Sequence, residues 1–403
     1  MIKSALKKTS LGRRRALSAG ALAVSALMLA PVLSSAQDTP IRIGYAISRT
    51  GIFAAAAQSA QEPYYVLWAE KVNAEGGLSV KGVKRKVELM GFDDRSDSET
   101  AIRTYQKLIT EDKVDLVLPP WGTHMNFAVA PLANKLGYPI VTPTAISDKL
   151  VGLKLPYLFI ALQQAAPMMN ALADMLESLK IKTVVLANMD DQFGLECTNA
   201  LEPLLKKKGI QILEKKSYPL DVKDLSPMLR SMKAKNPDAF IGITYPGDAF
   251  LVTGQAKEIG FTPKVFYTGV GTAFPIFRDR MGPAAENVMG MGSWNPKTGP
   301  QAKAFFDMAK ARYKTEPDRW ASAHTWASLQ ILQQSVEKVG LDRKAIRDYI
   351  ASTQFDTVIG PVKFNGSEDV TTPGMVLQWQ KGEFEVVWPR DRATAEIVFP
   401  KPQ

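Results

Sequence analysis

The sequence is poor in the side chains that carry out covalent and metal chemistry. Its 403 residues include one cysteine and two histidines. The single cysteine, Cys197, has no partner for a disulfide within the chain, so stability must come from packing. His124 and His324 lie far apart, and neither has a histidine or cysteine at the spacing of a zinc site. We therefore expect no metal and no cofactor.

Catalytic sequence motifs are missing as well. The sequence has no His-Glu-x-x-His, no phosphate-binding Gly-x-x-x-x-Gly-Lys-Ser/Thr and no Gly-x-Ser-x-Gly elbow. Gly269 and Gly271 begin a dinucleotide-binding pattern, but Phe274 stands where its third glycine belongs. The adjacent Asp93 and Asp94 are interpreted as a strand end before a helix with a capping box at 96–99. Because no nucleophile, base and orienting group come together, we expect that the protein is not an enzyme.

Acidic residues are absent from the first 36 positions, which contain six Lys or Arg residues. A weakly apolar run follows at 16–33 and ends in the small residues Ser34, Ser35 and Ala36. This pattern is typical of an export signal, and the run is short for a membrane span. We predict a signal peptide over 1–36, cleaved near Ala36, and a periplasmic protein. The sequence leaves the Sec and twin-arginine export routes open.

Removing this leader changes the net charge of the chain. The full sequence has 50 basic and 40 acidic residues, so subtracting the six basic residues of the leader leaves 44 against 40, or +4. This modest charge is accompanied by no zinc-finger spacing and no basic strand studded with aromatic residues. We therefore expect no nucleic-acid partner.

Strand-like and helix-like segments alternate along the rest of the sequence, which is typical of α/β folds with mostly parallel sheets. A first run of this alternation ends near residue 145, and a second begins near 165, which predicts two lobes. Three consecutive helices and three short strands follow, so we expect the chain to cross between the lobes more than once. Strands are predicted at 41–45, 87–92, 114–118, 138–141, 183–187, 211–217, 239–244, 265–268, 362–364, 375–380 and 385–388. Helices are predicted at 58–73, 96–110, 126–136, 167–179, 193–208, 225–234, 249–259, 301–313, 321–339 and 343–352.

The ligand site of such a fold lies beyond the carboxyl ends of the parallel strands, where helix N-termini offer unpaired N–H groups. The loops at these positions are rich in hydroxyl and aromatic side chains, which favours a small polar molecule with an apolar part. These loops are 48–53, 119–123, 143–145, 190–194, 245–248 and 269–271.

Five segments in this order resemble the periplasmic substrate-binding proteins of ABC transporters, of the Leu/Ile/Val-binding type. They are Ile41-Arg42-Ile43-Gly44-Tyr45 with Thr50-Gly51, Asn73-Ala74-Glu75-Gly76-Gly77, Asp93-Asp94, Asp190-Asp191-Gln192-Phe193-Gly194 and Thr357-Val358-Ile359-Gly360-Pro361-Val362-Lys363-Phe364. The resemblance implies two α/β lobes of the type I periplasmic-binding-protein fold, joined by three hinge crossovers. The expected N-terminal lobe is 37–160 plus 293–370, and the C-terminal lobe is 161–292 plus 371–403. The expected hinges are 159–161, 291–294 and 367–372.

The resemblance also implies which residues hold the ligand. First-lobe loops of the family bind the ligand carboxylate through hydroxyls and backbone N–H groups, and second-lobe aromatic residues cover it. The predicted ligand-binding residues are Phe53, Trp121, Gly122, Thr123, Thr144, Ala145, Phe193, Tyr245 and Val270.

Three positions depart from the family pattern. Val270 stands near the position of the acidic residue that binds an α-ammonium group, Ile146 where a hydroxyl is common, and Ala56 where an aromatic residue can cover the ligand. A carboxylate without an amine, aromatic or aliphatic, fits Val270 and Trp121 better than a standard amino acid. Asp248 is the alternative source of the missing negative charge.

The resemblance implies that the protein is the extracytoplasmic binding component of an ABC importer. It would capture a branched-chain or related amino acid, or an amine-free organic acid, between two closing lobes. Its expected partners are the permease and ATPase subunits in the inner membrane, and we expect a monomer. The alternative is a ligand sensor of the same fold that signals to a membrane receptor.

Overall fold

The computed structural model describes residues 39–402 of the chain. The predicted export signal lies outside the described residues. Within residues 39–402, no helix combines the length and the apolar character needed to cross a lipid bilayer.

The strands of the first lobe form a three-stranded sheet with order β4-β1-β5 and a five-stranded sheet with order β13-β14-β15-β7-β6. β1 is central in the smaller sheet and pairs in parallel with both neighbours. The larger sheet joins two strands from the first half of the chain to three from its last quarter. The strands are β1 (Ile41–Ile47), β4 (Val87–Asp93), β5 (Leu116–Val117), β6 (Ile140–Thr142), β7 (Leu158–Ile160), β13 (Gln354–Thr357), β14 (Gly360–Asn365) and β15 (Glu368–Asp369).

The second lobe is built on one seven-stranded sheet with order β17-β16-β12-β11-β10-β8-β9. The strands from β9 to β12 run parallel, and β16 and β17 add an antiparallel edge. The central strand β10 is buried along its whole length, as expected for a parallel strand covered on both faces. The strands are β8 (Thr183–Met189), β9 (Gln211–Tyr218), β10 (Ala239–Ile243), β11 (Val265–Thr268), β12 (Met289–Met291), β16 (Val376–Gln380) and β17 (Glu383–Trp388).

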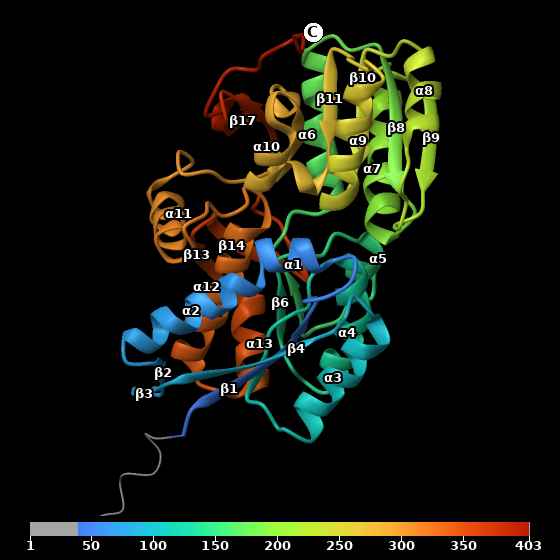
Figure 1. The fold of residues 1–403 in the computed structure, drawn as a ribbon. Coiled ribbons are helices and arrows are strands. Elements are labelled where there is room, and N and C mark those ends of the chain that lie inside the picture. The colour runs from blue at the N-terminus through green and yellow to red at the C-terminus, as the bar shows by residue number, and fades with distance from the viewer. Residues whose placement is uncertain (1–38, 403) are drawn as a thin grey trace, which may run out of the picture. The chain divides into compact units, whose positions relative to one another are not determined.

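Helices flank these sheets, as α7, α8 and α9 do beside β8 to β11 (Figure 1). The predicted α/β fold with two mostly parallel lobes is confirmed, and helices 321–339 and 343–352 have the predicted bounds. The helices are α1 (Ala54–Ala60), α2 (Glu62–Ala74), α3 (Ser98–Thr110), α4 (Thr123–Lys135), α5 (Asp148–Gly152), α6 (Ala165–Ser178), α7 (Gln192–Lys207), α8 (Ser226–Ala234), α9 (Pro246–Glu258), α10 (Pro275–Met281), α11 (Pro300–Tyr313), α12 (Ala321–Val339) and α13 (Arg343–Ser352), with the 3-10 turns η1 (Val270–Ala273), η2 (Gly282–Ala285) and η3 (Arg390–Arg392).

The predicted single helix over 58–73 is wrong, because it is divided into α1 and α2 at Gln61. Pro63 is the second residue of α2 and has no backbone N–H to continue the hydrogen-bond ladder of α1. Proline is well accepted in a first turn, where N–H groups have no helical partner. The break points the buried Gln61 side chain at the loop that follows β5, where its Nε2 donates to the Pro119 carbonyl at 2.9 Å.

The capping box predicted at 96–99 is also wrong. Asp97 caps α3, and its Oδ1 accepts a hydrogen bond from the Thr100 N–H at 2.7 Å. Ser96 instead reaches the loop after β1, where its Oγ accepts from the Phe53 N–H at 3.0 Å. The segment after β4 therefore helps to place Phe53, one of the predicted ligand-binding residues.

Several short elements carry no clear sequence pattern and were not predicted. They include α5, α10, β7, β12 and the hairpin of β2 (Leu78–Val80) and β3 (Val83–Arg85). Most span only three to seven residues, which is too short for a helical or strand period to emerge.

The chain passes between the lobes three times, from β7 to α6, from β12 to α11 and from β15 to β16. His324 on α12 contacts the first two of these crossovers. Its Nδ1 lies 2.7 Å from the Ala161 carbonyl, and its Nε2 lies 3.4 Å from Nε1 of Trp294. Because an indole N–H only donates, Nε2 accepts and Nδ1 carries the proton. The exact domain boundaries stay a prediction.

Candidate ligand-binding site

Four aromatic rings from separate loops meet at the carboxyl ends of the three-stranded and the seven-stranded sheets. Phe53 and Trp121 come from first-lobe loops, and Phe193 and Tyr245 from the second lobe. Tyr245 stacks on Phe193 with ring centroids 5.3 Å apart. It also makes T-shaped contacts with Phe53 and Trp121, with ring centroids 5.6 and 5.5 Å apart. All four side chains are buried. The structure thus brings these four predicted residues together in one cluster that spans both lobes.

Tyr245 is held in place by two carboxylates. It precedes α9, and its backbone N–H donates to Oδ1 of Asp248 at 2.9 Å. Its hydroxyl donates to Oδ2 of Asp191 at 2.8 Å. Oδ2 of Asp248 accepts a second hydrogen bond, from the Tyr218 hydroxyl at 2.6 Å. We call Phe193, Tyr245, Asp191 and Asp248 the second-lobe wall.

Burial changes the acidity of this wall. Desolvation raises the pKa of Asp248 to about 7, and the nearby charge of Asp191 acts in the same direction. Desolvation also raises the pKa of Asp191 above its ordinary value. The second-lobe wall therefore carries less negative charge near neutral pH than two exposed carboxylates would.

The first-lobe loops are connected by neutral hydrogen bonds. The Thr144 hydroxyl accepts from the Gly122 N–H at 3.0 Å and donates to Oε1 of Gln61 at 2.8 Å. The Thr123 hydroxyl accepts from the Ile146 N–H at 3.0 Å and lies 3.3 Å from the Ile146 carbonyl. We call residues 119–123 and 144–147 the first-lobe wall. Both predicted hydroxyls thus have protein partners that fix the loops.

Helix α4 begins at this wall. Its N-cap is Gly122, whose φ of +90° is a conformation that favours glycine, and no side chain caps the helix. No acidic residue lies in its first turn. The Asn126 amide donates to the Pro120 and Gly122 carbonyls at 2.9 and 2.8 Å, which holds the loop against the helix. The free N–H groups and the dipole of this end suit an anion.

The two lobes also touch through polar side chains beside the rings. Ser147 caps α5 and donates from its hydroxyl to Oε1 of Glu196 on α7 at 2.9 Å. The Ala145 carbonyl accepts from the amide of Gln164 at 3.1 Å, and Gln164 precedes α6. The residue of this loop that caps α5 is therefore Ser147. The Thr144 hydroxyl instead accepts the hydrogen bond from the Gly122 N–H.

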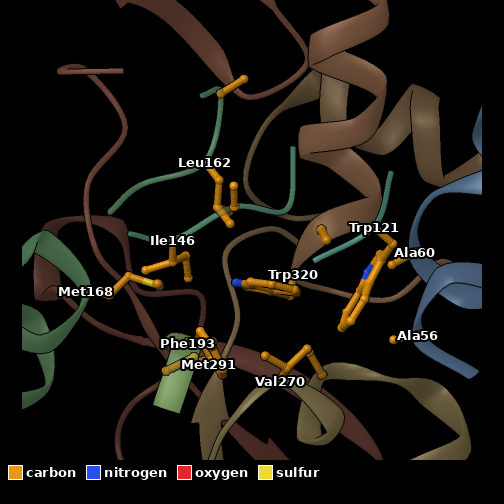
Figure 2. Close-up of a cluster of buried hydrophobic side chains, with 14 of the residues drawn as sticks. Ala56, Ala60, Trp121, Ile146, Leu162, Met168, Phe193, Val270, Met291 and Trp320 are labelled. Carbon is orange, nitrogen blue, oxygen red and sulfur yellow. The ribbon is translucent and has the colours of Figure 1, made fainter. Parts of the chain in front are cut away.

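A buried apolar cluster adjoins the rings, with side chains from both lobes (Figure 2). Val270, near the position where the family pattern expects an acid, is fully buried, and its N–H donates to the Thr244 carbonyl at 2.9 Å. The labelled members of the cluster are Ala56, Ala60, Trp121, Ile146, Leu162, Met168, Phe193, Val270, Met291 and Trp320.

Trp320 is the member that the sequence analysis missed. It immediately precedes α12, and Figure 2 shows its indole between Trp121 and Ile146, with its nitrogen on the side away from Trp121. The predicted ligand-binding residues all lie in loops that follow strands, whereas Trp320 follows no strand. Within residues 39–402, the buried Nε1 atoms of Trp121 and Trp320 have no hydrogen-bond partner.

A groove of about 340 Å³ opens next to the rings and is lined from both lobes, by Ile52 and Phe53 on one side and Tyr245, Asp248 and Leu251 on the other. A larger groove of about 840 Å³ lies elsewhere, along α2, α10 and α11. The predicted residues meet at the aromatic and apolar clusters and not in that larger groove.

Two further reactive side chains, Cys197 and His324, are buried. Cys197 is buried, which raises the pKa of its thiol. Burial lowers the pKa of His324 to about 4. Residues 39–402 include no cluster of three or more His, Cys, Asp or Glu side chains arranged to hold a metal ion.

Two lobes joined by three crossovers, with aromatic and apolar side chains meeting between them, define a ligand-binding protein of two lobes. The family model described as periplasmic binding protein matches residues 40–383. The chain therefore belongs to the periplasmic binding protein family, as the resemblance implied.

Named relatives agree with this assignment. The Leu/Ile/Val-binding protein homolog 7 of Brucella abortus is 24% identical over 354 residues, covering 82% of this chain and 87% of the relative. The substrate-binding protein LivJ of a branched-chain amino acid transporter from Streptococcus pneumoniae, solved with isoleucine, has a TM-score of 0.76 at 22% identity and covers 90% of this chain and 100% of its own. A solute-binding protein of an ABC transporter from R. palustris, solved with benzoate, has a TM-score of 0.75 at 18% identity, covering 89% and 98%. At these identities the solved structures establish the fold.

Proposed function

We propose that the protein is the substrate-binding component of an ABC importer and captures a small carboxylate-bearing molecule between its lobes. The observation that carries this proposal is the uncapped N-terminus of α4 beside a cluster of buried rings from both lobes. Such a site offers N–H donors to a carboxylate and apolar contact to the rest of the ligand. Two of the related structures were solved with the carboxylate-bearing ligands isoleucine and benzoate, which supports this class.

Ligand capture would work through lobe closure. Trp121 and Tyr245 belong to different lobes and are in ring contact, and Ser147 reaches Glu196 across the same gap. A ligand that contacts both walls gains its full set of interactions only when the lobes are together. Ligand binding therefore shifts the population toward the closed form, and the three crossovers act as the hinge.

The predicted ligand-binding residues divide into two roles in this proposal. Trp121, Gly122, Thr123, Thr144 and Ala145 shape the carboxylate end, with Thr123 and Thr144 acting through the loops that they fix. The second-lobe rings and the apolar residues then enclose the body of the ligand: Phe53, Phe193, Tyr245 and Val270.

The proposal includes the cellular context. The mature protein would lie in the periplasm as a monomer and deliver its ligand to permease and ATPase subunits of the inner membrane, without chemical change to the ligand. A sensor that presents the closed form to a membrane receptor remains the second candidate. Transport by membrane vesicles that contain the neighbouring permease, with and without the added protein, separates these two functions.

Binding is tested directly by isothermal titration of the mature chain with small carboxylic and amino acids, after ligand carried through purification has been removed by unfolding and refolding. We expect at least one such compound to bind with a dissociation constant in the micromolar range or below, as transport proteins of scarce solutes require. Mass spectrometry of the released compound identifies the natural ligand. Recovery of a chemically altered compound after long incubation would contradict the transport proposal.

A further inference from the structure

The apolar cluster beside the four rings contains two hydrogen-bond donors that the protein leaves unpaired. The side chains of Trp121 and Trp320 are 1% and 3% exposed, and neither indole N–H has a partner within residues 39–402. A buried donor without an acceptor costs free energy, so native proteins rarely retain one without a reason. Both donors belong to the same cluster (Figure 2). By contrast, the indole N–H groups of Trp68, Trp294 and Trp379 each have an acceptor. Trp68, for example, donates to Oε1 of Gln333 at 2.9 Å.

The labelled members of this cluster include no carboxylate that could pair with an ammonium group. The position near Val270, where the family pattern expects an acid, holds a fully buried valine. An ammonium group placed beside it would lose its hydration without gaining a counter-charge, which is among the most costly forms of burial.

The nearest carboxylates of the second lobe are already in use. Asp191 accepts from the Tyr245 hydroxyl and from the Gly194 N–H, so both of its oxygens have protein donors. Asp248 likewise accepts from the Tyr245 N–H and the Tyr218 hydroxyl. Both carboxylates therefore serve to position Tyr245.

The charged neighbours of Trp320 are also engaged elsewhere. Asp318 accepts from the N–H groups of Trp320, Ala321 and Ser322 and so caps the start of α12. The Arg319 guanidinium donates to the Phe384 carbonyl and to the carboxylates of Glu316 and Glu383. Trp320 thus enters the cluster as a neutral donor flanked by charges that point to other partners.

We infer that the ligand is an apolar monocarboxylic acid without an amino group, and that the indole N–H groups of Trp121 and Trp320 donate hydrogen bonds to its oxygen atoms. This inference rests on the proposed function and narrows its ligand class. The two indoles supply both hydrogen-bond donors and apolar surface. An apolar acid can use both, whereas an amino acid bound in the same place would leave its ammonium group unpaired. Trp320 would then help to determine the specificity for an acid over an amino acid. Its position could not be predicted by searching the loops that follow strands.

Matched ligand pairs test the inference. Isothermal titration compares leucine with 4-methylpentanoate, which is leucine without its amino group, and phenylalanine with 3-phenylpropanoate; benzoate is added as a smaller acid. We expect the acids to bind, and each amino acid to bind at least about 100-fold more weakly than its partner, because its ammonium group would be buried unpaired. Equal or tighter binding of leucine would overturn the inference and leave the proposed function standing. If no compound in this panel binds, the inference fails, and the wider titration with carboxylic and amino acids tests the proposed function separately.

Substitution of the two indoles provides the second arm. Trp320→Phe and Trp121→Phe keep a ring but remove the donor, and each is expected to weaken binding of the preferred acid about 10-fold or more. The thermal midpoint of the ligand-free protein should stay equal or rise, since an unpaired buried N–H is removed. Trp68→Phe is the matched control: it breaks a formed hydrogen bond, so it should lower the ligand-free midpoint and leave acid binding unchanged. Unchanged acid binding in both cluster variants would refute the donor role.

Val270→Glu supplies the third arm by restoring an acid. We expect it to weaken binding of 4-methylpentanoate and to strengthen binding of leucine, reversing the order of the pair. Val270→Gln is similar in size and uncharged, so it should not reverse the order. A folded Val270→Glu variant that keeps the original preference would contradict the inference. If that variant does not fold, the ligand pairs and the indole variants still decide the outcome.

Discussion

The two walls of the candidate site are fixed by different chemistry. The first-lobe wall is held by neutral groups: Thr144 bridges Gly122 and Gln61, and Thr123 ties in Ile146. The second-lobe wall depends on carboxylates whose pKa values are raised by burial. Hydroxyls and amides do not titrate near neutral pH, so the first-lobe wall should keep its structure across a wide pH range. The second-lobe wall should change with pH, because its carboxylates titrate. The structure of the first-lobe wall is thus insulated from pH, whereas that of the second-lobe wall is sensitive to it.

The largest effect should come from removing the ring that joins the two walls. Tyr245→Ala deletes the stack on Phe193 and the T-shaped contacts to Phe53 and Trp121, and it leaves Oδ2 of Asp191 without a donor. We expect roughly a 100-fold loss of affinity for the preferred ligand, in line with removal of a central aromatic anchor. Isothermal titration measures it. Tyr245→Phe, which loses only the hydroxyl, should lose much less, and unchanged binding in Tyr245→Ala would remove this cluster from the site.

A similar test on the first-lobe wall should appear mainly as lost stability. Thr144→Val keeps the shape of the side chain but leaves the Gly122 N–H and Oε1 of Gln61 unpaired. We expect the free energy of unfolding in urea to fall by about 2–3 kcal/mol. Thr142→Val is the control, because among residues 39–402 the Thr142 hydroxyl has a single, long hydrogen bond, 3.5 Å from the Thr144 N–H. Equal losses in the two variants would show that the bridge between loops has no special role.

The titration of Asp248 should give the second-lobe wall its own pH dependence. Its pKa is about 7 in the folded protein, against an ordinary value of 3.8, so the folded form binds this proton more tightly than the unfolded chain does. Stability from this group therefore rises as the pH falls from about 7 to about 4. We expect Asp248→Asn to reduce the change in unfolding free energy over this pH range by about 1–2 kcal/mol. This value is smaller than the full pKa shift would give, because the Asp248 side chain is only half-buried. Urea unfolding at pH 4.5, 6 and 7.5 measures it, with the exposed Asp279→Asn as control; an unchanged slope would contradict the assignment.

The smallest effect concerns the polar contact between the lobes. Glu196→Ala removes the acceptor for the Ser147 hydroxyl, and closure loses about 1 kcal/mol of favourable interaction. We expect a few-fold weaker ligand affinity, with faster ligand release measured by stopped-flow fluorescence. Gln192→Ala is the control, since Gln192 contacts Glu196 from within α7. A release rate that changes equally in both variants would assign the effect to α7 rather than to the contact between lobes.

The ring residues could be found from the sequence because they follow strands. Phe193 and Tyr245 stand at the first turn or the cap of a helix after a buried apolar run, and parallel sheets gather such positions at one edge. The partners of Tyr245 could not be found in this way, because the contacts with Asp191 and Tyr218 depend on how loops from different βα units pack. The sequence likewise named Thr144 as a candidate without showing that its hydroxyl is bound to Gln61, 83 positions earlier.

The sequence by itself determined the class of fold and predicted the edge at which a ligand would bind. Periodic apolar segments encode parallel strands and helices, and the order of those segments implies two lobes with late elements returning to complete them. Tertiary structure alone decided which donors stay unpaired, since that depends on every group within a few ångströms. Trp320 shows the difference: nothing before α12 marks it locally, and only folding places its indole beside Trp121 in a cluster built from both lobes.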